Sequence, residues 1–280
     1  MDNFCIMVNK DRDEHLALTK RVQAFLTAQG KTYCIRTESL DSADEPFEAL
    51  PKETECVIVL GGDGTMIRAA NRLLHYDIPI FGINAGTLGY LTGVEAADAE
   101  HGLERICRDD FRVEQRMLLD AELNGEYVDT VLNEVAITRS GLSRLISVAV
   151  YVNGALLDVV SGDGLLISTP TGSTGYNLSA GGAVVKPGAK LIMLTPICPH
   201  SLTSREVIVA SSDEIVIEVV EGRRSKDVEA VVTFDGRDAK ELVAGDRVTI
   251  RKSAYTTKMI QLDERTFFEV LRSKLGSVEQ

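Results

Sequence analysis

Several features that the sequence lacks narrow the functions it could have. It contains no run of 18 apolar residues, so it offers no candidate membrane span. The 30 lysines and arginines are outnumbered by 42 aspartates and glutamates, which gives a net charge of -12. This balance argues against a broad basic surface for nucleic acid or an anionic membrane. A polyanionic ligand such as a nucleotide would therefore need local backbone donors or a divalent cation.

Cysteine and histidine are sparse and scattered. The five cysteines form no CxxC pair and no cluster with the four histidines, so we expect no zinc site. An odd, dispersed set of cysteines fits a reducing compartment. The first residues also lack the basic region of a secretory signal. We therefore expect a cytoplasmic protein.

The motifs of several large enzyme classes are absent. The sequence has no GxxxxGK[ST] phosphate loop, no GxGxxG dinucleotide fingerprint, no GxSxG and no HExxH. The four histidines have no spacing typical of a metal site or a catalytic triad: His15, His75, His101 and His200. We expect no protein-held metal.

What is present indicates a folded protein with two kinds of domain. A hydrophobic fraction of 44% and a charged fraction of 26% are typical of globular chains. Up to about residue 108, apolar strands alternate with amphipathic helices, which predicts an open α/β sheet. Beyond that point β-branched runs are joined by tight turns such as Asn124-Gly125 and Asn153-Gly154, the strongest short hairpin signal.

The predicted fold class is therefore α/β plus β. It comprises an N-terminal open α/β sheet domain (1–108), a larger, mainly antiparallel β domain (109–254) and a C-terminal segment (255–280). The last segment carries a helix, Thr266 to Leu275, which we expect to return to the first domain. The expected strands of the β domain include Val131 to Thr138, Leu156 to Val160, Leu165 to Ser168, Ile208 to Ala210, Ile215 to Val220, Ala230 to Phe234 and Val248 to Arg251.

The first candidate site is a glycine turn, Gly61 to Thr65, between the apolar run Cys56 to Leu60 and an amphipathic helix. Glycines allow a ligand to approach the backbone, and the helix N-terminus offers free N–H groups to an anion. Asp63 is unexpected beside such an anion site. It is either a helix-capping residue or a base or metal contact aimed at the reacting group.

A second glycine-rich turn, Asn84 to Tyr90, follows the next expected strand, Ile78 to Ile83. In open parallel sheets, ligands bind beyond the carboxyl ends of the strands. Both turns are expected at that edge, so we predict that they share one crevice.

Three segments of the β domain are also candidates. Asn133-Glu134 is a polar pair inside an apolar run, where an unpaired buried glutamate would be costly; it is either ligand-facing or a hydrogen-bonded structural pair. Asp163 lies between two glycines and is either functional or part of a self-bonded turn. Ser168 to Gly182 is dense in hydroxyls and glycines, which suits ribose and phosphate oxygens, unless the segment is simply a flexible loop.

Taken together, these segments resemble the bacterial NAD kinases. The resemblance depends on Gly61-Gly62-Asp63-Gly64-Thr65, then Asn133-Glu134, then the highly specific Thr169 to Gly182 segment. It extends over nearly the whole chain, including Gly82 to Leu91. Gly175, Ala183 and Tyr90 replace the family's usual Ala, Pro and Phe.

The resemblance implies transfer of the ATP γ-phosphate to the 2′-hydroxyl of the adenosine ribose of NAD, giving NADP. It implies Mg²⁺ carried with ATP, and a homodimer or homotetramer. Asp63 would be the general base. The residues that would bind substrate are Gly64, Asn133, Glu134, Arg144, Ser161, Asp163, Thr174, Gly175, Tyr176, Asn177, Leu178 and Ser179, and the weaker candidates are Gly61, Gly62, Thr65, Arg68, Tyr90 and Arg237.

Two other functions stay open on the sequence. Similar glycine turns occur in lipid kinases of the diacylglycerol type, although the ribose-suited Thr169 to Gly182 segment speaks against a lipid substrate. A non-catalytic NAD or NADP sensor would use the same binding residues without forming product. The sequence does not decide between ATP and polyphosphate as donor, or between NAD and NADH as acceptor.

Overall fold

The computed structural model describes residues 1–9, 16–38, 48–86, 89–140, 145–201, 203–220, 230–262 and 266–276. Contacts divide the chain into two compact units. Unit 1 comprises Met1–Gln115 with Thr257–Gln280, and unit 2 comprises Arg116–Thr256. The fold class expected from the sequence, an α/β domain and a mainly antiparallel β domain, is confirmed.

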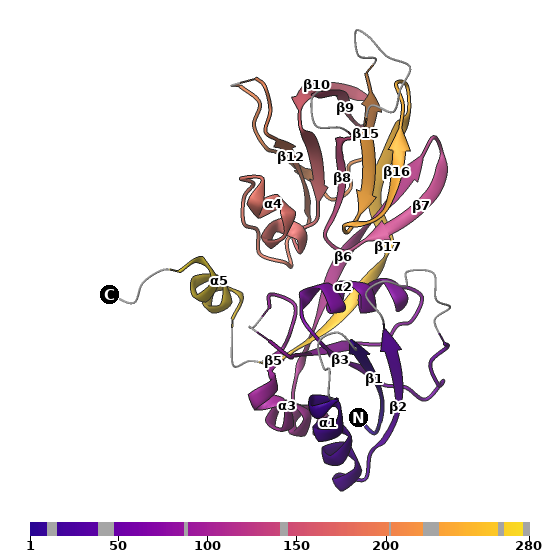
Figure 1. Ribbon diagram of the computed structural model, residues 1–280, viewed down its shortest axis with the longest axis vertical. Helices are drawn as coiled ribbons and strands as arrows, with labels where there is room; N and C mark the ends of the chain where they lie inside the picture. The colour runs from indigo at the N-terminus through magenta and orange to yellow at the C-terminus, as the bar shows by residue number, and fades with distance from the viewer. Residues whose placement is uncertain are drawn as a thin grey trace. The chain divides into compact units, whose positions relative to one another are not determined.

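Unit 1 is built on a parallel sheet in the strand order β2-β1-β3-β4. Figure 1 labels β1, β2 and β3 of this sheet. A short strand, β5, pairs with the outer side of β4. All of these pairings are parallel, as βαβ connections require. The strands are β1 (Asn3–Asn9), β2 (Thr32–Glu38), β3 (Cys56–Leu60), β4 (Ile80–Asn84) and β5 (Val94–Glu95).

Helices cover both faces of this sheet. Alternate strand residues such as Phe4 and Ile58 form one core cluster with α1 (Ala17–Ala28) and α3 (Ala99–Cys107). On the other face, α2 (Asp63–Arg72) approaches so closely that a Cβ on Gly82 would collide with Met66. A parallel sheet buried on both faces explains why β3 is wholly apolar in sequence, why β4 is apolar up to its last residue, Asn84, and why both strands are fully buried.

The C-terminal segment returns to unit 1. The end of β17 (Arg247–Gln261) pairs in parallel with β4 at Met259, and Ile260 and Leu262 join the unit 1 core. The final helix α5 (Phe267–Leu275) begins with a capping box between Thr266 and Glu269. None of its described residues is buried. Its contacts with unit 1 include two with Tyr90 of the second glycine turn: the Phe267 ring lies 6.4 Å from that of Tyr90, and the Lys274 ammonium lies 5.7 Å from the same ring.

Unit 2 is a sandwich of antiparallel sheets. One has the order β10-β9-β14-β17 and the other β13-β12-β11-β8-β15-β16, while β6 pairs with β7 and β17. The two sheets share one core, to which strands such as β6, β9, β14 and β15 contribute every second residue. The strands are β6 (Arg112–Leu123), β7 (Glu126–Val131), β8 (Glu134–Arg139), β9 (Ile146–Val152), β10 (Ala155–Gly162), β11 (Gly164–Ser168), β12 (Leu191–Ile197), β13 (Val207–Ala210), β14 (Ile215–Val219), β15 (Ala230–Phe234) and β16 (Arg237–Leu242).

One predicted strand is wrong. The run from Val131 to Thr138 is interrupted at Leu132 and Asn133, so β7 ends before this pair and β8 begins after it. The reason is that the N–H groups of residues 132–134 bond to the Asp235 carboxylate and not to a neighbouring strand. Both expected hairpins are confirmed, with positive φ at Asn124-Gly125 and Asn153-Gly154. Among the described helices, none is long and apolar enough to cross a membrane.

Candidate active site

The first glycine turn closes the carboxyl end of β3 and begins α2. Gly61 is required because a Cβ there would overlap the Thr65 side chain. Gly62 is the N-cap of α2, and no described side chain caps this helix. A Cβ on Gly62 or Gly64 would meet no described atom within 4 Å, so this end of the helix is open to a ligand. An uncapped helix N-terminus behind a glycine turn is suited to phosphate.

The Asp63 carboxylate is bound by the second glycine turn. Its Oδ2 accepts a hydrogen bond from the Tyr90 N–H at 2.9 Å and its Oδ1 one from the Leu91 N–H at 3.0 Å. It does not cap its own helix. The two turns therefore meet, as expected, and this contact explains Gly89, whose Cβ would occupy the place of the Asp63 carboxylate.

Two asparagines at the same edge of the unit 1 sheet were not among the site residues predicted from the sequence. Asn9 ends β1 and donates from Nδ2 to the Thr65 hydroxyl at 3.1 Å, so it holds the first turn. Asn84 ends β4, and its Oδ1 accepts from the Gly86 N–H at 2.9 Å. Both are almost fully buried. The sequence signal that could have identified both is a polar residue at the end of an apolar run.

In unit 2 the Asn133-Glu134 pair meets the hydroxyl-rich segment. The Thr169 N–H donates to the Asn133 carbonyl at 2.8 Å, and the Thr169 hydroxyl donates to the Leu132 carbonyl at 2.6 Å. Gly172 packs so tightly on the Asn133 backbone that a Cβ would not fit. Two motifs widely separated in the sequence therefore form one structure.

Buried polar atoms gather at this junction. Within the described part of the chain, four of them have no hydrogen-bond partner: Asn133 Oδ1, Glu134 Oε2, Ser168 Oγ and Thr171 Oγ1. Glu134 and Ser168 are direct neighbours on paired strands. Leaving such groups unpaired is costly, so a polar ligand is the simplest reason for the arrangement.

The charge state of Glu134 is also unusual. Burial, with a smaller contribution from the nearby Asp235 carboxylate, raises the pKa of Glu134 to about 8. At neutral pH the carboxyl group is then mostly protonated, so it can donate a hydrogen bond as well as accept one.

The helical end of the hydroxyl-rich segment divides into exposed and buried residues. It contains a short 3-10 helix, Gly172–Thr174, and α4, Tyr176–Ser179. Tyr176 is 39% exposed and is available to a ligand. Asn177 is fully buried; its Nδ2 donates to the Ala183 carbonyl and its Oδ1 accepts from Thr195, so it holds the segment from within.

The remaining candidate site residues of unit 2 each contact a different partner residue. Asp163 forms an ion pair with Arg139 at 2.9 Å, and its flanking glycines are needed because a Cβ on either would strike a neighbouring carbonyl. The Ser161 hydroxyl bonds to that of Ser147 at 2.7 Å. Arg237 pairs with Asp129 at 3.2 Å. Arg144 lies outside the described residues.

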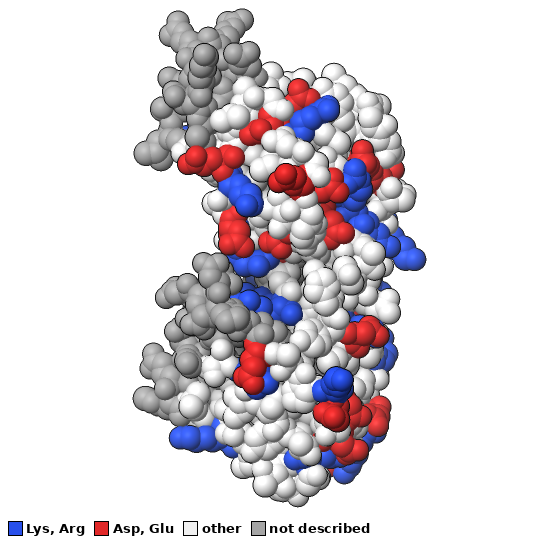
Figure 2. Space-filling model, turned by 90° about the vertical axis from the view of Figure 1, so that its right-hand side faces the viewer, with Lys and Arg blue, Asp and Glu red and all other residues white. Residues whose placement is uncertain are grey.

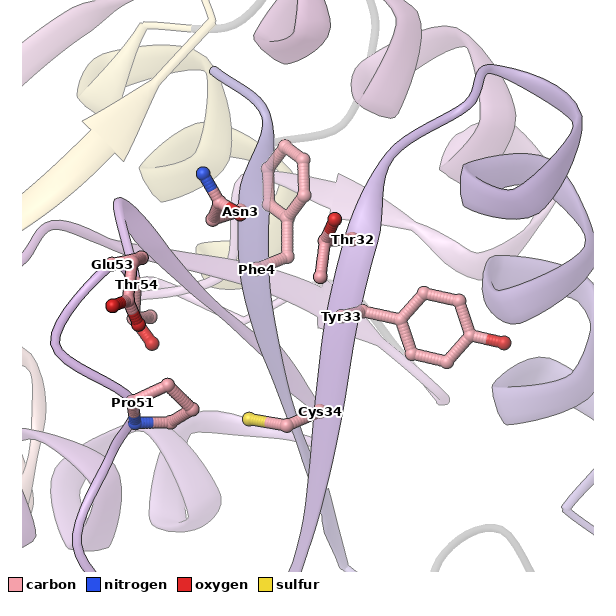
Figure 3. A pocket seen from close by; sticks show the side chains of 8 residues that line it. All are labelled: Asn3, Phe4, Thr32, Tyr33, Cys34, Pro51, Glu53 and Thr54. Carbon is pink, nitrogen blue, oxygen red and sulfur yellow. The ribbon is translucent and has the colours of Figure 1, made fainter.

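The carboxyl-edge turns of unit 1 are distinct from a pocket at the opposite edge of the sheet (Figure 3). This cavity, of about 300 Å³, lies at the amino ends of β1 and β2. Its open lining offers no set of converging polar groups, and we assign it no part in the site. It is lined by Asn3, Phe4, Thr32, Tyr33, Cys34, Pro51, Glu53 and Thr54.

On the face drawn in Figure 2, lysines and arginines lie next to aspartates and glutamates and do not form one basic area. No group of three or more His, Cys, Asp or Glu among the described residues is placed to hold a metal ion.

Comparison with known proteins gives matches over nearly the whole chain. Residues 4–111 match the family model for the ATP-NAD kinase N-terminal domain, and residues 132–262 match the model for the C-terminal domain. The chain is 44% identical to the NAD kinase of Lachnoclostridium phytofermentans and 39% identical to that of Agathobacter rectalis. Each alignment covers 99% of both chains.

Solved structures give the same result for the fold. An NAD kinase from Archaeoglobus fulgidus in complex with ATP superposes with a TM-score of 0.77 at 27% identity, covering 99% of this chain and 100% of that one. A yeast NADH kinase complexed with NADH reaches 0.85 at 22% identity, covering 100% of this chain and 89% of that one. The alternatives of a lipid kinase and a non-catalytic sensor are not favoured by these matches. The resemblance seen in the sequence is confirmed: the chain belongs to the ATP-NAD kinase family.

Proposed function

We propose that this protein phosphorylates NAD with ATP, at the 2′-hydroxyl of the adenosine ribose. One observation carries the choice of acceptor. The buried, unpaired polar atoms of Asn133, Glu134, Ser168 and Thr171 call for a ligand rich in hydroxyl and amide groups. NAD is such a ligand, and it is the substrate named for the relatives that match the whole chain.

In this proposal Asp63 is the general base. Each of its oxygens accepts one backbone N–H and keeps a further lone pair, so the carboxylate is fixed in direction and still able to take a proton. It removes the proton of the 2′-hydroxyl as that oxygen bonds to the γ-phosphorus. The bond from the γ-phosphorus to the bridging oxygen of ATP breaks, and ADP leaves. Such a base contributes about 10²–10⁴-fold to the rate.

Each unit carries its own set of proposed binding residues. In unit 1, Gly61, Gly62, Gly64 and Thr65 would receive phosphate at the α2 N-terminus. Arg68 follows on the same helix, and the N–H of Tyr90 binds Asp63. In unit 2 the acceptor would be held by Asn133, Glu134, Asp163 and the Thr174 to Ser179 segment, with Tyr176 packing on a ring. Ser161, Arg144 and Arg237 remain secondary candidates, and Asn177 supports this segment from the inside.

The metal would be Mg²⁺ that arrives with ATP. The described residues form no cage for it, and Mg²⁺ in kinases is commonly held by substrate phosphates and few protein groups. When bound, it neutralises phosphate charge. The cytoplasm inferred from the scattered cysteines remains the expected location.

We also propose a homodimer or homotetramer. The edge strand β10 exposes Leu156, Leu157 and Val159, each more than 40% accessible. An edge strand with exposed apolar side chains is a common place for another chain to pair.

One incubation with NAD, ATP and Mg²⁺ tests the proposed activity. We expect NADP and ADP in equal amounts, detected with a dehydrogenase specific for NADP. A lipid kinase would consume ATP only with lipid vesicles. A sensor would bind NAD and form no product, and either result would exclude the proposal.

A further inference from the structure

The turn between β15 and β16 carries a carboxylate to which the proposed function assigns no role. Asp235 and Gly236 have φ values of 49° and 71°, the left-handed pair of a type I′ hairpin turn that Asp-Gly favours. The hairpin does not need this side chain to close, because asparagine or glycine would make the same turn. The turn itself therefore does not require the carboxylate.

It binds the backbone of the segment that interrupts β7 and β8. Oδ2 accepts from the Leu132 N–H at 2.8 Å, and Oδ1 accepts from the N–H groups of Asn133 at 2.7 Å and Glu134 at 3.1 Å. The Asp235 N–H in turn donates to the Glu134 carbonyl at 3.0 Å. One residue thus makes four hydrogen bonds to three consecutive residues about a hundred positions earlier in the chain.

The same segment is held from its other side by Thr169, whose N–H and hydroxyl donate to the carbonyls of Asn133 and Leu132. With donors and acceptors both occupied, the backbone of this segment is held in place, which fixes the direction in which the Cα–Cβ bonds of Asn133 and Glu134 leave it. Both reach the same place, because a Cβ on Gly175 would lie 3.4 Å from Asn133 Nδ2 and 3.5 Å from Glu134 Oε2. Such fixing of ligand-binding groups by surrounding hydrogen bonds is what precise recognition requires.

We propose that Asp235 is a positioning residue, which fixes the Leu132–Glu134 backbone so that Asn133 and Glu134 can bind the adenosine ribose of the acceptor. The identity of the acceptor rests on the proposed function, whereas the contacts of Asp235 with residues 132–134 do not depend on it. Asp235 acts through Asn133 and Glu134 and does not touch the substrate.

The negative charge of Asp235 has a second effect. Among the described groups around Glu134, Ser168 on β11 and Asn133 are neutral, and Asp235 is the charged group that disfavours ionisation of Glu134. Asp235 thus helps to keep the Glu134 carboxyl protonated and able to donate a hydrogen bond.

The test compares Asp235→Asn with Asp246→Asn. Asparagine tolerates the left-handed φ of residue 235. Its NH₂ group would replace one carboxylate oxygen, so at least one backbone N–H of residues 132–134 would lose its acceptor. Asp246 is a matched control, because its carboxylate also accepts from a turn N–H, that of Val243, and from Asn124 within unit 2. We expect Asp235→Asn to raise the KM for NAD by about tenfold or more and the KM for ATP by less than about twofold.

A second readout needs no substrate. The carboxyl of Glu134, followed by carbon NMR in the free protein and assigned with Glu134→Gln, should titrate at lower pH in Asp235→Asn and unchanged in Asp246→Asn. If Asp235→Asn does not fold, Asp235→Ser, which keeps one short acceptor, replaces it with the same expected rise in KM.

The outcomes distinguish a failure of the proposed function from a failure of the positioning role of Asp235. If the wild-type chain forms no NADP, the proposed function fails, while the titration of Glu134 still tests the influence of Asp235. If the wild type is active and Asp235→Asn matches Asp246→Asn in KM for NAD and in the titration of Glu134, the positioning role is overturned and the function stands.

Discussion

At the scale of single residues, the contact between Asp63 and the second glycine turn changes how this carboxylate is understood. From the sequence it was either a helix cap or a catalytic group. Its oxygens accept from the N–H groups of Tyr90 and Leu91, and it does not cap α2. The capping alternative is therefore wrong, and the carboxylate is fixed by an element outside its own helix.

This contact predicts a specific role for Gly89. A methyl group there would overlap the Asp63 carboxylate, so Gly89→Ala should displace the proposed base. Because a misplacement of about 1 Å can cost ~10²-fold in rate, we expect kcat to fall at least tenfold with little change in NAD binding. Steady-state kinetics and calorimetry measure the two effects.

Gly86→Ala is the matched control for Gly89→Ala. A Cβ at residue 86 would meet Asn84 Oδ1 at 3.9 Å, an ordinary contact, so this variant should keep kcat within about twofold. Equal losses of kcat in both variants would show that the turn, and not the Asp63 carboxylate, is what the methyl group disturbs.

Glu134 should make the unliganded fold sensitive to pH. Its pKa rises from an ordinary value of 4.5 to about 8 in the folded chain. Between these values the unfolded chain has lost the proton that the folded chain keeps, so rising pH favours unfolding. Below about pH 4.5 the penalty is absent, and above about pH 8 it is complete.

Glu134→Gln removes this titration. Relative to the wild type, it should gain stability as the pH rises from 4.5 to 8, by on the order of 1 kcal/mol or more at the upper end. Urea unfolding at several pH values, without NAD, measures the difference. A constant offset between the two proteins across this range would contradict the predicted ionisation.

At the scale of elements, a buried network holds the α4 segment in place. The Thr195 hydroxyl on β12 lies 2.9 Å from Glu206 and also bonds to Asn177 Oδ1, while the Ala183 N–H donates to Glu206. Thr195→Val keeps the shape but leaves acceptors unpaired. We expect a loss of about 1–3 kcal/mol of unfolding free energy, measured by denaturant titration. Thr203→Val, at an exposed hydroxyl, should change it by less than about 0.5 kcal/mol.

Elements with a strong periodic pattern were predicted well. The fully buried run Cys56 to Leu60 is β3 to the residue, and both Asn-Gly hairpins occur where expected. In each case the local pattern and the tertiary environment favour the same structure.

Elements without such a pattern were missed or misplaced. β16 is charged and mostly exposed, so its residues carry no apolar alternation, and it exists because β15 pairs with it. The break at Leu132-Asn133 depends on Asp235, about a hundred residues later, which no local window contains. For the same reason the sequence predicted site roles for Asp63 and Asn133 but did not reveal their surroundings. It did not show that Gly89 lies against the Asp63 carboxylate, that Asn9 holds Thr65, or that Asp235 binds the Asn133 backbone.

At the scale of the whole molecule, the exposed apolar side chains of β10 predict self-association. Leu156→Asp should shift the sedimentation coefficient toward the monomer, because a charge would have to be buried in the pairing surface. Val243→Asp, at a similarly exposed site in a turn, is the control. If the wild-type chain sediments as a monomer at micromolar concentration, the proposed oligomer is wrong.

The proposed transfer of phosphate to NAD depends on Asp63 as the base for the acceptor hydroxyl. The most direct measurement is the kcat for NAD phosphorylation of Asp63→Asn beside that of Asp77→Asn, an exposed carboxylate paired with Lys258. We predict that Asp63→Asn binds NAD normally and loses at least about a hundredfold in kcat, while Asp77→Asn matches the wild type. An Asp63→Asn variant that phosphorylates NAD at nearly the wild-type rate would contradict the proposed role of Asp63 as the base.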